Sequence, residues 1–385
     1  MRDFLSWTQQ LRPLGGGFVG AKCSIDLGSG AESLHLFRMT ATGKLATELP
    51  LNAVGPAVLE RLGRFQLTSA AHAPSLLLAA IDSAALRHHF MALRPMVARR
   101  GSDIAAVVAF GDDVWALSGD PMQPEAVQSL LHLDLSGLDS PRLHDVPLGL
   151  LRLGDTRRIT AMATVNGYVY AAVCDPLAGF DLYRLDATLP DAGFTPVLTA
   201  GAQRFALNAA VAVLEVRGDA LLIGTAALAA GVDPVGQWGP ELLVLDADDH
   251  WDLIIGQPRF TPDGMRFPAS NLLPGLGNVQ NAALRAIATG QVAGEDLTLI
   301  AVQDHAGPAS PDRRLIGPED LMNYSGAVRL HGSLDLELWF PIRAVLPATC
   351  GAVTSLAVSE EGVLVGHESP APDDLPATFV PHDFP

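Results

Sequence analysis

The sequence predicts an all-β fold, a β-propeller made of repeated four-stranded units, on three observations. The first is a pattern that occurs five times: an apolar run, a tight polar turn and a second apolar run, beginning at Ile104, Ile159, Val211, Leu284 and Val353. Such runs around Gly, Asn-Gly or Gly-Asp predict β-hairpins, because these residues tolerate the positive φ of tight turns. The second is that most hairpins are followed by residues suited to two further strands. The third is that the repeats span most of the chain, which favours a single closed array.

The hairpins, with a shorter unit that begins at Arg64, predict six blades in a single domain of residues 1–385. The predicted blades are residues 64–100, 103–150, 159–200, 208–256, 281–341 and 352–367. The last blade has only two strands of its own, since residues 368–385 form a Pro-rich tail that is poorly suited to central strands. We expect residues 17–40 to supply its outer strands, so that N-terminal strands close the ring. A ring of seven blades, in which residues 17–50 belong to a separate blade, is the alternative.

Composition and charge exclude several classes of function. The net charge of −17 opposes phosphate backbones and anionic membrane surfaces, so we expect neither nucleic acid nor a membrane as a partner. With 49% hydrophobic and 17% charged residues, the chain can form a large core. Cys23, Cys174 and Cys350 lie far apart and form no CxxC motif, which predicts reduced thiols. The sequence shows neither a secretory signal nor an apolar run long enough for a membrane span, which predicts a cytoplasmic protein.

Several short motifs recur within the central blades. They are an Asn at the opening of an inner strand (Asn208 and Asn281), NGYVYA at 166–171, PELLVLD at 240–246, WDLIIG at 251–256 and GLGN at 275–278. Over about residues 159–300, these motifs resemble a loosely defined set of uncharacterised bacterial β-propeller proteins. The resemblance implies the propeller fold and no particular activity.

Loop lengths predict which face of the propeller is functional. The long insertions are residues 226–240, 256–280 and 305–325 and the tail after 368. All four are expected on the face where the second strand of each blade ends, whereas the turns on the opposite face are short. Long loops on a rigid scaffold commonly carry binding groups, so the loop-rich face is the predicted functional face.

Polar residues at the blade ends predict the site on this face. The candidate catalytic residues are Asp82, Asp175, Asp304 and Glu368. The candidate ligand-binding residues are Asp120, Arg158, Asn208, Asn281 and Trp238. His305 and His367 are candidate metal ligands, because His and carboxylate groups together suit a divalent transition metal. The alternative is structural: an Asp at a strand end commonly caps its own turn, and exposed loop histidines are common.

Two functions are compatible with these residues. The preferred one is an enzyme that acts on a small organic substrate at the mouth of the central channel. It would use acid-base or metal-assisted chemistry of the lyase, cyclase, isomerase or hydrolase type. The alternative is a non-catalytic propeller that binds a peptide, a glycan or a protein partner on the same face, since one fold hosts many functions.

Overall fold

In the computed structural model of the protein, most of the predicted units can be followed. The structure describes residues 4–13, 16–26, 32–50, 104–110, 113–118, 128–134, 142–151, 153, 157–226, 239–278, 281–304, 329–344, 346, 353–369 and 375–382. The predicted blade 64–100 and the insertion 305–325 lie outside these residues, as does most of the insertion 226–240.

The described strands of the ring form six antiparallel units, each built from strands that follow one another in the chain, and two short strand pairings join neighbouring units into larger sheets. The first unit consists of β1 (Phe4–Pro13), β2 (Gly17–Asp26), β3 (Glu32–Thr40) and β4 (Leu45–Pro50). The second consists of β5 (Ile104–Phe110), β6 (Asp113–Ser118), β7 (Ser129–Asp134) and β8 (Arg142–Asp145). The third consists of β9 (Arg158–Val165), β10 (Tyr168–Cys174), β11 (Asp181–Asp186) and β12 (Thr195–Leu198). The fourth unit consists of β13 (Ala210–Arg217), β14 (Ala220–Ala226), β15 (Leu242–Leu245) and β16 (Trp251–Ile255). The fifth consists of β19 (Asn281–Val292), β20 (Glu295–Asp304), β21 (Arg329–Ser333) and β22 (Phe340–Ile342). The sixth consists of β23 (Val353–Ser359), β24 (Gly362–Ser369) and β25 (Ala377–Pro381).

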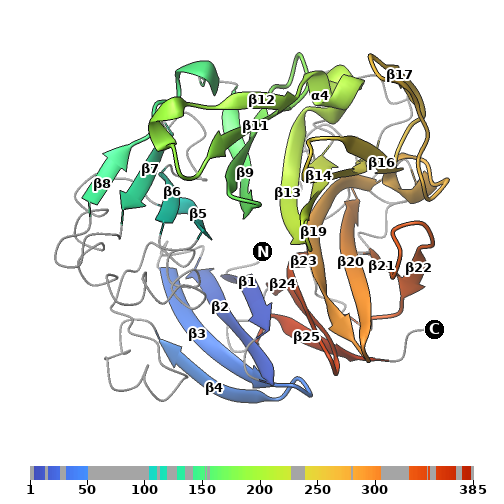
Figure 1. Ribbon diagram of the computed structural model, residues 1–385. Coiled ribbons are helices and arrows are strands. Elements are labelled where there is room, and N and C mark those ends of the chain that lie inside the picture. Colours follow the sequence, from blue (N-terminus) through green and yellow to red (C-terminus); the bar gives the residue numbers. More distant parts are fainter. Residues whose placement is uncertain are drawn as a thin grey trace.

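The units are arranged around a common centre, with the first strand of each unit innermost (Figure 1). Inner strands of successive units contact each other in the order β5, β9, β13, β19, β23 and β1. This radial repetition of antiparallel sheets is the arrangement of a β-propeller. The first described unit therefore lies beside the last one.

The hydrophobic core is divided among the interfaces between neighbouring units. One cluster joins Phe180 and Leu182 of the third unit to Val211 and Ile223 of the fourth, and equivalent clusters join the other described neighbours. A sheet that is apolar on both faces can bury itself only between two other sheets, which the radial arrangement provides. The described residues contain no helix that is long and apolar enough to cross a membrane.

Hydroxyl groups on the inner strands also link neighbouring units. The hydroxyl of Thr160 donates a hydrogen bond to the carbonyl of Val211 at 2.7 Å, between β9 and β13. Thr354 of β23 donates in the same way to the carbonyl of Thr8 of β1 at 2.5 Å. Because Thr8 belongs to the first unit and Thr354 to the last, this second bond ties the two ends of the chain together.

The N-terminal strands join the last unit in a way that differs from the prediction. Residues 17–26 and 32–40 do not pair with the strands of the last unit, because β2 pairs with β1 and β3, and β3 pairs with β4. The last unit takes its third strand from the Pro-rich tail, where β25 pairs with residues 362–366 of β24. The tail can do this because β25 is an outer strand, where a missing proline N–H costs little. Among the described N-terminal strands, β1 pairs with the last unit, at Ser6 and Trp7, and this pairing places β1–β4 and β23–β25 in one sheet.

The hairpin turns follow the predicted chemistry. Asn166 and Gly167 have φ of 52° and 81°, as a tight turn with two positive φ values requires. Short helical turns connect other strands: η2 (Gly149–Leu151), η3 (Pro190–Ala192), α4 (Ala200–Gln203) and η4 (Phe205–Asn208).

The predicted insertion of residues 256–280 lies between β16 and β19, and the structure describes it as far as residue 278. It forms a two-stranded ribbon, β17 (Arg259–Thr261) and β18 (Gly264–Arg266), followed by η5 (Pro274–Gly277). After the ribbon the chain returns along β16, where the N–H of Ala269 donates to the carbonyl of Leu253 at 2.9 Å. The ribbon lies beside β16 and α4 at the outer side of the fourth unit (Figure 1).

Candidate functional site

The turn that leads into β13 has an unusual backbone. Ala200, Gly201, Ala202 and Gln203 of α4 all have positive φ, between 53° and 66°, and Phe205 has φ of 54°. Only glycine adopts this conformation at low cost, and each other residue costs roughly 1–2 kcal/mol. Such backbone persists only where its surroundings hold it in place, and it is concentrated at functional sites.

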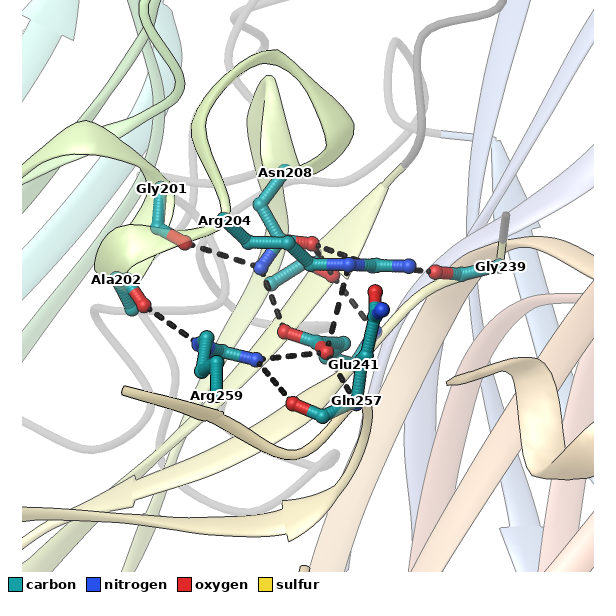
Figure 2. A network of polar contacts seen from close by, with 9 residues as sticks. Gly201, Ala202, Arg204, Asn208, Gly239, Glu241, Gln257 and Arg259 are labelled. Carbon is teal, nitrogen blue, oxygen red and sulfur yellow. Dashed lines mark hydrogen bonds and ion pairs between the residues drawn. The ribbon is translucent and has the colours of Figure 1, made fainter. Parts of the chain in front are cut away.

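A buried polar network centred on Glu241 holds this turn (Figure 2). The side chain of Glu241 is 0% exposed. Its Oε1 accepts hydrogen bonds from the N–H of Gln257 at 2.7 Å and from Nη1 of Arg259 at 2.9 Å. Its Oε2 accepts from Nδ2 of Asn208 at 2.7 Å. Nε of Arg204 lies 3.5 Å from Oε1, so two guanidinium groups share one buried carboxylate.

The arginines of the network reach the backbone of other loops on the same face. Nη1 of Arg204 donates to the carbonyl of Gly239 at 2.8 Å and to Oδ1 of Asn208 at 3.0 Å. Nε of Arg259 donates to the carbonyl of Ala202 at 2.8 Å, within the strained turn. Burial lowers the pKa of Arg204, and the charge of Glu241 opposes that effect. The network joins the loops before β13, before β15 and after β16 into one rigid surface. It also keeps the carboxylate of Glu241, which is 0% exposed, away from solvent.

Asn208 and Asn281, both predicted to bind a ligand, occupy equivalent positions before inner strands. Nδ2 of Asn208 donates to the carbonyl of Gly201 at 3.1 Å, and Nδ2 of Asn281 donates to the carbonyl of Gly275 at 2.7 Å. Gly201 and Gly275 have φ of 60° and 64°. Both asparagines are buried. Through this hydrogen bond, each asparagine side chain stabilises the left-handed turn that leads into its strand.

Asp175, a predicted catalytic residue, caps the turn after β10. Its Oδ1 accepts hydrogen bonds from the N–H groups of Leu177 and Ala178, both at 2.9 Å, and its Oδ2 lies 2.5 Å from Nη1 of Arg157. Burial raises the pKa of Asp175, but the hydrogen bonds from Ala178 and Arg157 outweigh it and lower that pKa overall. This is the turn-capping alternative for a strand-end Asp. Arg158, the predicted binding residue next to Arg157, begins β9.

His367, a predicted metal ligand, is buried between β24 and β25. Its Nδ1 donates to the carbonyl of Glu368 at 3.1 Å, and its Nε2 lies 3.1 Å from the hydroxyl of Thr378. Burial lowers the pKa of His367, and the hydrogen bond to Glu368 only partly opposes this effect. Both ring nitrogens are thus engaged within the last unit. Among the described residues, no group of three His, Cys, Asp or Glu side chains is placed to hold a metal ion.

Glu368, the next residue, lies near a cation of the neighbouring unit. Desolvation by its surroundings lowers the pKa of Arg285 of β19, a residue that is exposed to solvent, and the charge of Glu368 opposes this effect. Asp304 ends β20 opposite Asn281 in the strand register. The remaining predicted site residues, Asp82, Asp120, Trp238 and His305, lie outside the described residues.

The loop-rich face also exposes large apolar side chains. Leu177 is 86% exposed, Phe205 59%, Phe260 81%, Met265 40% and Phe267 67%. These five residues are called the apolar patch below. Isolated exposed apolar residues are normal on a protein surface, but a contiguous group marks an interaction site.

Backbone contacts show that the segments carrying the apolar patch adjoin one another. Gly179, two residues after Leu177, has φ of 92° and approaches Phe205 so closely that a Cβ there would lie 2.4 Å from its carbonyl oxygen. The α4 turn in turn contacts β17, through the hydrogen bond between Arg259 and Ala202. The segments that carry these five side chains therefore adjoin one another across the third and fourth units.

A hollow of about 170 Å³ lies elsewhere, between β7, β8 and η3. It is lined by His132, Asp134, His144, Asp145, Val146, Pro190 and Asp191. The ring of His132 stacks on the buried Trp115, with 5.0 Å between centroids.

Sequence reasoning missed Glu241, the two arginines and the apolar patch. One signal was available in the sequence. The turn residues Pro262, Asp263 and Gly264 lie between two short runs, Arg259-Phe260 and Met265-Arg266-Phe267, in which Arg directly precedes Phe. That pattern predicts a hairpin inside the insertion. The three-dimensional position of Glu241 has no signature in the sequence.

Comparison with known proteins adds nothing specific to this description. No family model matches the chain, and no curated protein matches it. Solved structures that resemble it include the β-propeller domain of the Trilobed protease from Pyrococcus furiosus (8% identity, 94% of this chain and 77% of that chain, TM-score 0.35). An acylaminoacyl peptidase from Pyrococcus horikoshii (8% identity, TM-score 0.47) matches over 98% of this chain, which spans 51% of that protein. The SapL1 lectin, solved with alpha methyl fucoside, has 7% identity over 94% of this chain and 87% of its own, with a TM-score of 0.41. Likenesses at this level carry no argument about activity or ligand.

Proposed function

We propose that this protein is a partner-binding β-propeller, and that its apolar patch is the binding surface. The observation that supports the proposal is the exposure of Leu177, Phe205, Phe260 and Phe267 on adjoining segments of one face. The buried network around Glu241 holds that face rigid before any partner arrives. A rigid surface loses little conformational entropy on binding, which favours affinity.

The test replaces patch residues that lie outside the β17–β18 ribbon. Wild-type protein, the double variant Leu177→Ser/Phe205→Ser and the control Leu338→Ser are immobilised, and the proteins that each retains from a cell extract are identified. Leu338 is a suitable control, because it is 76% exposed but lies in the short turn between β21 and β22. We expect at least one protein to be retained by the wild type and the control and lost from the double variant. The proposal fails if all three, equally folded by circular dichroism, retain the same proteins.

Catalysis at the mouth of the channel is the second candidate function. It is favoured by the electrostatic interaction of Glu368, a predicted catalytic residue, with the exposed Arg285. A carboxylate beside a cation can serve both proton transfer and substrate anchoring. Thermal stabilisation by a panel of small carboxylic acids, lost in Arg285→Gln, would support this candidate. A panel that stabilises neither protein would count against it.

For the ring itself we propose seven blades. The described residues already supply six units, of which residues 4–50 are one. The hairpin pattern of residues 64–100 supports a seventh, between β4 and β5. This is the alternative count with a separate N-terminal blade, and an experimental structure that shows fewer than seven sheets would exclude it.

A further inference from the structure

The β17–β18 ribbon has one polar and one apolar face. Arg259 pairs with Arg266 across the ribbon, and Phe260 pairs with Met265. Side chains of directly paired residues lie on the same face, and successive residues alternate between faces. The two arginines therefore share one face of the ribbon, and Phe260 and Met265 share the other.

The face with the arginines is turned toward the protein. Arg259 reaches Glu241 at 2.9 Å, and Arg266 forms an ion pair with Asp252 at 2.7 Å. Both guanidinium groups lie over the ring of Trp251, each 5.4 Å from its centroid. These contacts fix the orientation of the ribbon from both strands, and each guanidinium is paired with a carboxylate.

The apolar face is turned toward solvent as a result. Phe260 is the most exposed phenylalanine of the apolar patch, and Phe267 follows the ribbon directly. A ribbon that served only to cover β16 would be more stable with Phe260 buried and the arginines in water. The observed orientation is the reverse, and it is held by one buried ion pair, Arg259 with Glu241, and one more exposed ion pair, Arg266 with Asp252.

We propose that this ribbon is the recognition element for a protein segment that carries apolar side chains flanked by lysine or arginine. The inference rests on the proposed partner-binding function and names its partner. The apolar part of the partner covers Phe260 and Met265. The basic part is indicated by charge: Asp263 is exposed at the tip of the ribbon, both ribbon arginines face the protein and pair with carboxylates, and the whole chain carries a net charge of −17. A second copy of this chain carries the same charge and is disfavoured as the occupant.

Two labelled peptides probe this chemistry: one of alternating leucine and lysine, and one in which glutamate replaces every lysine. Their binding is measured by fluorescence anisotropy at physiological salt. The variants are Phe260→Ser/Met265→Ser for the apolar face and Asp263→Lys for the tip, with Leu338→Ser as the matched control. All the replaced side chains are exposed, so the variants are expected to fold, which circular dichroism checks.

We expect the leucine and lysine peptide to bind the wild type and Leu338→Ser equally. Its Kd should rise by at least about tenfold in Phe260→Ser/Met265→Ser, because burying one such side chain already contributes that much. Asp263→Lys should weaken binding severalfold, and the glutamate peptide should bind the wild type at least about tenfold more weakly.

Three outcomes would overturn the inference. They are unchanged binding in the ribbon variant, equal binding of the two peptides, and a wild-type dimer, seen by light scattering, that the ribbon variant loses. The last outcome would make a second copy the occupant. The proposed partner-binding function is tested independently of these experiments, because its own test replaces Leu177 and Phe205, which are not in the ribbon. If those residues matter and the ribbon does not, the inference alone is wrong.

Discussion

Replacing Glu241 with glutamine is the sharpest test of the buried network. The change keeps the shape of the side chain and removes its charge. Two arginines, with side chains 3% and 9% exposed, are then left without their shared carboxylate. Removing one partner of a buried ion pair costs about 3–5 kcal/mol, because the remaining charge stays buried and uncompensated.

The hydrogen bonds show why glutamine cannot compensate. The groups around the Glu241 carboxylate are all donors. They are the N–H of Gln257, Nη1 of Arg259, Nδ2 of Asn208 and Nε of Arg204. The new amide NH₂ must face one of them. Rotating the amide of Asn208 would not help, because its Oδ1 already accepts from Arg204 and from Thr225, at 3.0 and 3.2 Å.

The measurement is the free energy of unfolding in guanidinium chloride for wild type, Glu241→Gln and Asp252→Asn. Asp252 is the matched control, because it also pairs with an arginine of the ribbon, at 2.7 Å, but is 67% exposed. Its loss should cost about 1 kcal/mol or less. If Glu241→Gln loses no more stability than Asp252→Asn, with unchanged dependence on denaturant, the network does not hold the loop-rich face as argued.

Two further predictions concern the inner strands. Burial raises the pKa of Glu215 from its ordinary 4.5 to about 7, so the folded protein keeps a proton that the unfolded chain has released, and stability should fall as pH rises from 4.5 to 7. Glu215→Gln should flatten this part of the stability profile measured by thermal unfolding against pH, and an unchanged slope would contradict the assignment. Thr354→Val removes the hydroxyl that donates to Thr8 and should cost about 0.5–1.5 kcal/mol. It should also speed amide hydrogen exchange in β1 more than in β9, and equal exchange in both strands would argue against a tie between the ends of the chain.

Strand periodicity and turn chemistry were enough to predict the hairpins. The Asn166-Gly167 turn and the pairing of β9 with β10 follow from residues that are neighbours in the chain, so local preference decides them. The assignment of residues 17–40 failed for the opposite reason. Whether β2 pairs with β1 or with a distant strand depends on which sheet edge is nearby, and that information is not local.

In the candidate site, too, the local sequence predicted residues, whereas tertiary contacts decided their roles. Asp175 was predicted from its place at the end of a strand. Its role follows from its contacts, since it accepts hydrogen bonds from the turn after β10 and forms an ion pair with Arg157. His367 was found as a His beside a carboxylate, whereas burial between β24 and β25 occupies both its ring nitrogens. The apolar patch was missed, since exposure of a phenylalanine cannot be read from its type.

The sequence by itself determined that the chain is made of repeated antiparallel units, because alternation and tight turns act over a few residues. Tertiary structure alone decided which way the β17–β18 ribbon faces. The alternation of Arg and Phe in the ribbon is compatible with either orientation. Glu241, Asp252 and Trp251 select one of them by binding the arginines, and so leave Phe260 and Met265 in solvent.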